Sequence, residues 1–189
     1  FIAMVGVQAL LLETPPTKSE KSSNMKLNKM VYLISFASFA HTLFINAYST
    51  NIGIYIAENI SNNPGLAGMM TSVNAAFALV TGMVFSKISA VLKNFTLPFS
   101  ILIAAVGYGL VLTVDGMPGI LIVSALCGVS LSCFMAIGSY LISISVEQEA
   151  VAKASGVFSI IGGIGGLIAP IFMGNVAKIV LGENTAGNQ

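Results

Sequence analysis

The stretch PGILIVSALCGVSLSCFMAIGSYLISIS, residues 118–145, contains no charged side chain. As a helix it is long enough to cross roughly 30 Å of hydrocarbon with some tilt. Four further apolar stretches of sufficient length lie near residues 30–57, 65–86, 95–114 and 151–181. The sequence therefore predicts an all-α, polytopic membrane helical bundle with five full spans.

Composition supports the membrane prediction. Hydrophobic residues make up 56% of the chain and charged residues 8%, with a mean hydropathy of +0.91. Soluble proteins carry about 25% charged residues, so this chain has too few charges to cover a soluble surface. The net charge of +1 gives no indication of nucleic-acid binding, because the lysines are spread along loops and no arginine is present.

The N-terminal residues divide into an apolar and a polar part. Residues 1–12 are apolar but about half as long as a span requires, so they are expected to be the end of a helix from a preceding half of the protein. Residues 13–29 contain Pro15-Pro16 and four lysines and predict a loop. Residues 30–189 then form the helical half. Its short connections near Glu58 and Asp115 predict antiparallel neighbours.

The lysines predict the orientation of the chain. Seven of the eight lie in the polar segments 13–29, 87–94 and 146–153, whereas the turns near Glu58 and Asp115 have none. Cytoplasmic loops keep positive charge and translocated loops do not. We therefore expect a multi-pass protein of the cell membrane in which these three segments are cytoplasmic.

Small and polar residues recur along the first full span at helical spacing, which places them on one stripe. This stripe consists of Ser35, Ser38, Thr42, Asn46, Ser49 and Gly53. Such a stripe packs against another helix or lines an aqueous cavity. The amide of Asn46 favours the cavity, because an unpaired amide in hydrocarbon is costly.

His41 lies on the flank of that stripe and is the only histidine of the chain. An ionisable group inside a membrane is a candidate site for substrate binding or proton transfer. The alternative is a neutral imidazole that hydrogen-bonds to a neighbouring helix. Since all seven acidic residues lie in loops or at span ends, a carboxylate that couples a proton would belong to another part of the protein.

Two other spans also carry small-residue faces, whereas the span 95–114 shows none. The predicted faces are Gly68, Thr71, Ala75, Ala78 and Gly82, with Asn74 beside them, and Ser124, Gly128, Ser132 and Ala136. Both are expected to pack closely against a neighbour. Asn74 is the additional cavity candidate.

The last span is rich in glycine. Its predicted close-approach face consists of Gly156, Ser159, Gly163, Gly166, Pro170 and Gly174. Gly162, Gly166 and Pro170 are expected to let the helix flex, although a static packing groove explains them nearly as well. A dinucleotide site is excluded, because Ile168 replaces the required glycine and no strand precedes the run.

Other chemistry is not indicated. Cys127 and Cys133 fall in one span and point in different directions around the helix, so we interpret them as reduced packing residues. The sequence contains no metal-ligand spacing, and no cofactor is expected. A membrane-embedded enzyme would need a second catalytic group near His41, which the spans do not supply.

Two local motifs resemble the C-terminal half of a major facilitator superfamily transporter. Gly82-Met-Val-Phe-Ser86-Lys87 is similar to the family's cytoplasmic G-x-x-x-D-[RK]-x-G motif, with Ser86 in place of the aspartate and Ser89 in place of the second glycine. EQEAVAKASGVFSIIGG, residues 147–163, is similar to the start of a Gly-rich eleventh helix. The resemblance covers the end of the sixth to the end of the eleventh helix of a twelve-helix fold.

The resemblance implies a secondary transporter that binds substrate at mid-membrane between two halves and works by alternating access. Its partners would be the lipid bilayer, the N-terminal half and a small-molecule substrate, a solute or drug driven by a proton or ion gradient. The expected cavity residues are His41, Thr42, Asn46, Ser49 and Asn74. A non-transporting helical membrane receptor or scaffold is the alternative.

Overall fold

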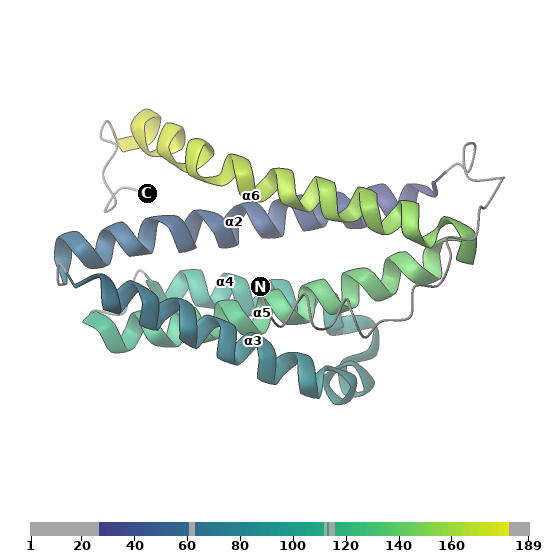
Figure 1. Ribbon diagram of the computed structural model, residues 1–189, viewed down its shortest axis with the longest axis horizontal. Helices are drawn as coiled ribbons and strands as arrows, with labels where there is room; N and C mark the ends of the chain where they lie inside the picture. The colour runs from purple at the N-terminus through teal and green to yellow at the C-terminus, as the bar shows by residue number, and fades with distance from the viewer. Residues whose placement is uncertain (1–26, 61–62, 112, 114–115, 182–189) are drawn as a thin grey trace, which may run out of the picture.

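The computed structural model describes residues 27–60, 63–111, 113 and 116–181, and these are almost entirely helical (Figure 1). The long helices are α2 (Lys29–Asn59), α3 (Pro64–Leu92), α4 (Thr96–Val111), α5 (Gly116–Ser145) and α6 (Val151–Leu181). Two 3-10 turns, η1 (Lys93–Phe95) and η2 (Gln148–Ala150), precede α4 and α6. The predicted all-α bundle is confirmed. The predicted half-helix 1–12 and most of the predicted loop 13–29 lie outside the described residues.

Asparagine caps begin two of the helices. The Asn63 side chain accepts a hydrogen bond of 2.9 Å from the Gly65 backbone N–H, and Pro64 occupies the first turn of α3. Asn28 makes the equivalent contact with the Met30 N–H at 3.4 Å. These side chains satisfy N–H groups that have no partner within the helix, and proline at this position loses no helical bond.

The predicted loop 87–94 is largely wrong. α3 continues to Leu92, because the sequence between Lys87 and Lys93 contains no glycine or proline to end a helix. The helix stops where Lys93 adopts a positive φ of 47°. Lys87 therefore lies on the last turns of a helix, and only η1 separates α3 from α4.

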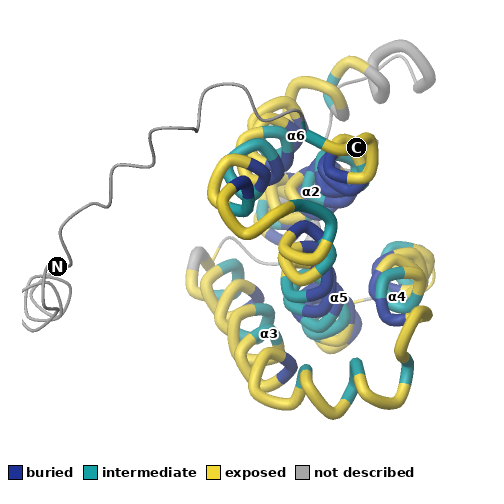
Figure 2. The backbone as a smooth tube through the Cα atoms, turned by 90° about the vertical axis from the view of Figure 1, so that its right-hand side faces the viewer, coloured by how far each residue is buried: buried dark blue, intermediate teal, exposed yellow. Residues whose placement is uncertain are grey.

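Four described stretches are long and apolar enough to cross a bilayer: Lys29–Ala57, Gly65–Val111, Gly116–Ser145 and Gln148–Phe172. The second contains both α3 and α4 within 47 residues. Figure 2 shows α3 and α4 on opposite sides of α5, so they are separate helices. α4 alone has 16 residues, or about 24 Å at the usual rise per residue.

Helix α5 is the centre of the described bundle. It packs between α3 and α4, while α2 packs along α6 and also contacts α5 (Figure 2). Its large inward side chain Phe134 is fully buried, together with Phe158 of α6 and Val31 of α2. On the outside, Met83, Val91 and Leu167 are 76%, 82% and 78% exposed. Large apolar side chains on the outside fit a lipid environment, where their exposure carries no hydrophobic cost.

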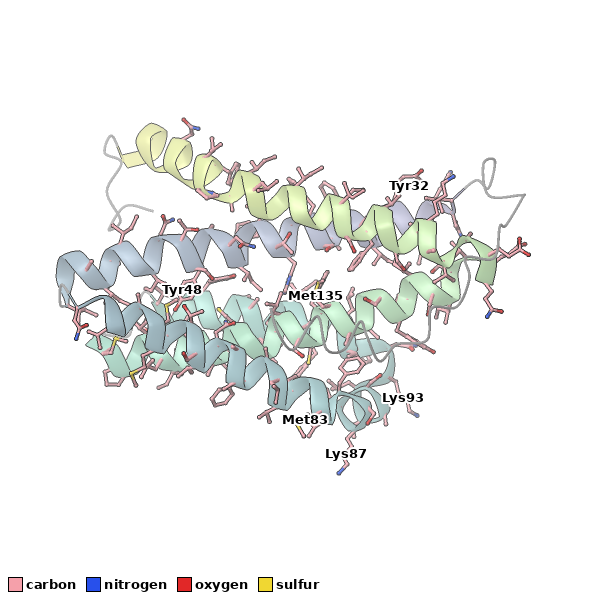
Figure 3. The ribbon with its side chains drawn as sticks, viewed as in Figure 1. Tyr32, Tyr48, Met83, Lys87, Lys93 and Met135 are labelled. Atoms are coloured by element: carbon pink, nitrogen blue, oxygen red, sulfur yellow. The ribbon has the colours of Figure 1, made fainter. Side chains whose placement is uncertain are left out.

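Four lysines lie at one end of the bundle: Lys29, Lys87, Lys93 and Lys153. α2 begins, α3 ends and α6 begins at this end (Figure 1), and Figure 3 places Lys87 and Lys93 there. Lys29 and Lys153 belong to the first turns of α2 and α6. The alternating direction of the helices therefore brings together lysines that are distant in sequence.

The predicted close-approach face of α6 is wrong by about one residue. Ser159, Gly163 and Pro170 are exposed, and a Cβ at Gly163 would meet nothing within 4 Å. The face that meets α2 contains Gly162 and Gly165, together with Gly166 of the predicted face, where a Cβ would lie 3.1 Å from the Asn46 amide. A Cβ at Gly165 would collide with the Phe39 carbonyl, and one at Gly162 would lie 2.6 Å from the Ser38 hydroxyl. Because the glycines of α6 occur as the adjacent pairs Gly162-Gly163 and Gly165-Gly166, the sequence is compatible with two small-residue faces about 100° apart around the helix.

The predicted face of α3 is correct only at Ala78 and Gly82: the Ala78 nitrogen lies 3.2 Å from where a Cβ on Gly128 would be, and a Cβ on Gly82 would lie 3.4 Å from the Ser132 hydroxyl of α5. Gly68, Thr71 and Ala75 are exposed. The side that meets α5 carries Asn74 and Ala78, whose backbone atoms lie where a Cβ on Gly128 would be. The predicted α5 row does face α3, since Ser124 and Gly128 are buried and only a glycine fits at position 128 without a backbone shift.

Alanine substitutions of the paired glycines test the corrected α6 face. Gly165→Ala should lower stability by about 1–3 kcal/mol, because the methyl group meets the α2 backbone. Gly163→Ala is the matched control and should be neutral or slightly stabilising, since alanine has the better helix propensity. The thermal unfolding midpoint of the full-length protein in lipid nanodiscs measures both. Equal midpoints for the two variants would contradict this packing.

Candidate functional site

His41 is held inside the bundle by two residues of α5. Its Nε2 lies 3.0 Å from the Ser130 hydroxyl, and its ring stacks on Phe134 with centroids 4.1 Å apart and planes 9° apart. The side chain is 7% exposed. Nδ1 has no hydrogen-bond partner among the described residues. In this state His41 is therefore a buried interhelical group, which is the alternative left open by the sequence.

Ser130 extends this contact to a third helix. Its hydroxyl donates a 2.7 Å hydrogen bond to the Ser100 carbonyl of α4. A chain of polar contacts thus runs from His41 on α2 through α5 to α4. Ser130 and Phe134 were not among the predicted site residues. Both lie on the α5 face that His41 contacts. Their spacing of four residues, which places them on one side of a helix, is the signal in the sequence that could have indicated them.

The expectation that span 95–114 has no small or polar face is wrong. The buried residues of α4 are Thr96, Ser100, Ala104 and Gly107. Their spacing of four, four and three residues marks one helix face. The Thr96 hydroxyl donates to the Lys93 carbonyl of η1 and the Ser100 hydroxyl to the Leu97 carbonyl of α4, each at 2.7 Å. The Ser100 carbonyl can still accept the Ser130 bond.

Thr42 joins α2 to α6. Its hydroxyl lies 2.6 Å from the Gly162 carbonyl, and the Ser38 and Phe39 carbonyls of its own helix lie at 2.8 and 3.2 Å. A hydroxyl has one hydrogen to donate, so these three carbonyls compete for it. Thr42 is therefore part of the α2–α6 interface, and Gly162 supplies both the space and the acceptor.

Asn46 and Ser49 have exposed side chains. The Asn46 amide donates to the Thr42 carbonyl at 2.8 Å and lies opposite Gly166, where a Cβ would come within 3.1 Å of it. Its carbonyl oxygen and second N–H remain available on the surface. Ser35 and Ser38, about three and two turns before Asn46 on the same stripe, are 0% and 1% exposed. The stripe thus runs from the bundle interior to the surface.

Asn74 belongs to a different cluster from His41. Its amide donates a 3.1 Å bond to the Ser124 carbonyl, and the Ser124 hydroxyl lies 3.3 Å from the Tyr48 hydroxyl. The Tyr108 ring of α4 lies 5.9 Å from the Tyr48 ring. Ser124 and Ser130 are six residues apart on α5, or about 9 Å along its axis. The structure therefore does not bring Asn74 and His41 together.

The three residues expected to flex α6 differ in position. Gly162 is buried, Gly166 is half-buried and Pro170 is exposed. α6 continues through Pro170 to Leu181, so the proline does not end the helix. The two glycines face α2, whereas Pro170 lies on the outer side.

Cys127 and Cys133 are buried and unpaired, in agreement with their interpretation as packing residues. Among the described residues, no three His, Cys, Asp or Glu side chains are grouped so that they could hold a metal ion. The polar groups in the interhelical contacts described above are hydroxyls, an amide, one imidazole and backbone carbonyls. Their chemistry is hydrogen bonding.

A comparison of the sequence with protein-family models finds a match. The family model described as Major Facilitator Superfamily matches residues 34–182, which include almost all of α2 and extend to the end of α6. The chain belongs to the major facilitator superfamily. This superfamily member matches no curated protein and no solved structure. Its family membership and its apolar helices together make it a multi-pass membrane transporter.

Substitution of Thr42 tests the hydrogen bond between α2 and α6 in this superfamily member. Thr42→Val keeps the side-chain shape but removes the hydroxyl, and should destabilise the protein by about 0.6 kcal/mol, a usual size for such bonds in membranes. Thr42→Ser retains the donor and should stay closer to the parent protein. Thermal unfolding in nanodiscs separates them. A valine variant as stable as the parent would show that the contact with Gly162 contributes nothing.

Proposed function

We propose that this protein is part of a secondary active transporter that moves a small solute or drug by alternating access, coupled to a proton or ion gradient. Family membership supports transport, and the polar stripe of α2 supports the place of the substrate. The substrate would be bound at mid-membrane between this half and an N-terminal half. A non-transporting receptor or scaffold of the same fold is the alternative that the experiments below would reveal.

The observation that carries the proposal is the exposed end of the α2 stripe. Asn46 and Ser49 lie 17 and 20 residues after the start of a 31-residue apolar helix, and both are exposed. An exposed amide at that depth would be costly against lipid. It is stabilised if this surface faces water, substrate or the other half. We therefore assign Asn46 and Ser49 to direct substrate contact.

His41, Thr42 and Asn74 take a different part in the proposal. Their polar atoms bond across helices in this state, to Ser130, to Gly162 and to Ser124 respectively. They would line the cavity only in states in which α2 or α3 moves away from its neighbour. The small contact surfaces at Gly162 and Gly166, with Pro170 further along, would allow α6 to follow such a movement.

The location of the lysines supports a cell-membrane protein with one cytoplasmic end. We propose that the ends bearing Lys87, Lys93 and Lys153 face the cytoplasm, together with the segment 13–29, because positive loops are retained on that side. The segments 87–94 and 146–153 would then both be cytoplasmic, although residues 87–92 are helical.

Replacement of Asn46 tests the substrate site. Asn46→Leu in the full-length protein should impair transport at least tenfold, on the order of the loss of a buried polar contact to substrate, without preventing membrane insertion. Asn175→Leu is the matched control, because Asn175 is also exposed and also donates to the carbonyl four residues earlier, at 2.8 Å. Uptake or efflux in cells, normalised to protein in the membrane, measures both. Unchanged transport in the Asn46 variant would refute the assignment.

Single cysteines test the orientation. In a background without Cys127 and Cys133, cysteine at Lys93 should react with a membrane-impermeant maleimide only after the cells are opened. Cysteine at Asn63, at the opposite end of α3, should react in intact cells. Reversed reactivity would place the lysine-bearing end outside.

A further inference from the structure

We infer that Ser130, held by the Ser100 carbonyl, is a positioning residue that fixes the tautomer of His41 and presents its Nδ1 as a hydrogen-bond acceptor. The group that His41 receives during transport would then be a hydrogen-bond donor. This inference rests on the proposed function for its use of His41, but its physical core is independent of transport.

The positions of the hydrogens follow from a count of donors. The Ser130 hydroxyl has one hydrogen, and its oxygen lies 2.7 Å from the Ser100 carbonyl oxygen. The Ser130 hydroxyl is the donor in this bond, because a carbonyl can only accept. The same serine oxygen lies 3.0 Å from Nε2 of His41. Since the serine hydrogen is already in use, Nε2 must carry the hydrogen of that contact.

Two side chains of α5 fix the ring itself. Phe134 is one helical turn after Ser130 and lies flat against the imidazole, which sets the ring plane. The Ser130 bond sets the rotation of the ring within that plane. Phe134 is 0% exposed, so this support belongs to the packed core of the bundle.

The tautomer decides the chemistry of the other ring nitrogen. A neutral imidazole that carries its hydrogen on Nε2 has a lone pair on Nδ1, which can only accept. Nδ1 is buried and has no hydrogen-bond partner among the described residues. A buried acceptor without a partner favours any rearrangement that supplies a donor. The fitting ligands are therefore hydroxyl, amine or ammonium groups, whereas a carboxylate would be repelled.

The role proposed for Ser130 explains why its hydroxyl bonds to the Ser100 carbonyl of α4, a contact that packing alone does not require. A serine at position 130 could bond to its own helix, as Ser143 and Ser145 do with the Tyr140 and Leu141 carbonyls. Its hydroxyl reaches α4 instead. The oxygen lone pair is thereby turned toward α2, where His41 uses it.

Nitrogen NMR of the histidine ring tests the inference. Full-length protein, labelled with ¹⁵N in its histidine side chains and reconstituted in nanodiscs, is compared with a His41→Gln sample to assign the signal. Wild type should show the hydrogen on Nε2. Ser130→Ala should lower the ratio of the Nε2–H tautomer to the Nδ1–H tautomer by about fivefold, the effect of one net hydrogen bond. Ser130→Thr should restore this ratio. Ser132→Ala, on a neighbouring part of α5, is the control.

A hydrogen on Nδ1, or on both nitrogens, in the wild type would overturn the inference. An unchanged tautomer ratio in Ser130→Ala would overturn the role of Ser130. The measurement uses no substrate, so its failure is distinct from failure of the proposed function. Normal transport by the Asn46→Leu variant would refute the proposed substrate site but would leave the predicted tautomer of His41 untouched. A different tautomer would overturn the inference but would leave the proposed substrate site untouched.

Discussion

The structure depends on the free-energy cost of a polar group that has no partner within the hydrocarbon layer. Each of the helix pairs α2–α6, α3–α5 and α4–α5 reduces this cost through one side chain that bonds to a backbone carbonyl of the neighbouring helix. The Thr42 hydroxyl has a carbonyl of α6 within hydrogen-bond distance, Ser130 donates to α4 and Asn74 donates to α5. A helical carbonyl has a second lone pair, so the acceptor helix loses none of its own bonds. The hydrophobic effect does not favour helix association in lipid, so these bonds and close packing determine which helices pair.

Close packing and hydrogen bonding reinforce each other at these contacts. The Thr42 hydroxyl reaches the Gly162 carbonyl because glycine places no side chain between the two backbones. At the α3–α5 contact, Gly128 allows the Asn74 backbone to approach, while the Asn74 amide bonds to Ser124 one turn away. α5 takes part in two of the three bonds, which explains its central position in the described bundle.

The sequence predicted the helices better than their faces. Long apolar runs located α2, α4, α5 and α6 closely, because hydrophobic length is a constraint on each helix by itself. The end of α3 was missed, because the polar residues from Lys87 onward continue the helix to Leu92. Faces depend on neighbours. On α6, the adjacent glycines allowed two stripes, and on α4 the pair of hydroxyls at Thr96 and Ser100 was too sparse to stand out. The partner of His41 is 89 positions away in the chain, and no local pattern contains such information. The five predicted site residues remain proposals, of which Asn46 and Ser49 are exposed on the described surface.

The change in burial along the α2 stripe has an electrostatic consequence. Ser35 and Ser38 are sealed within the bundle, whereas Asn46 and Ser49 lie at its surface, which in the proposed function faces water or substrate. Against water or substrate the local dielectric constant rises along this helix, and the strength of any Coulombic interaction falls in proportion. A charge that moved along α2 toward Ser38 would lose its hydration with each turn. In the proposed function, the sealed end of the stripe would oppose the entry of ions and its open end would admit them, without any charged side chain on the helix face.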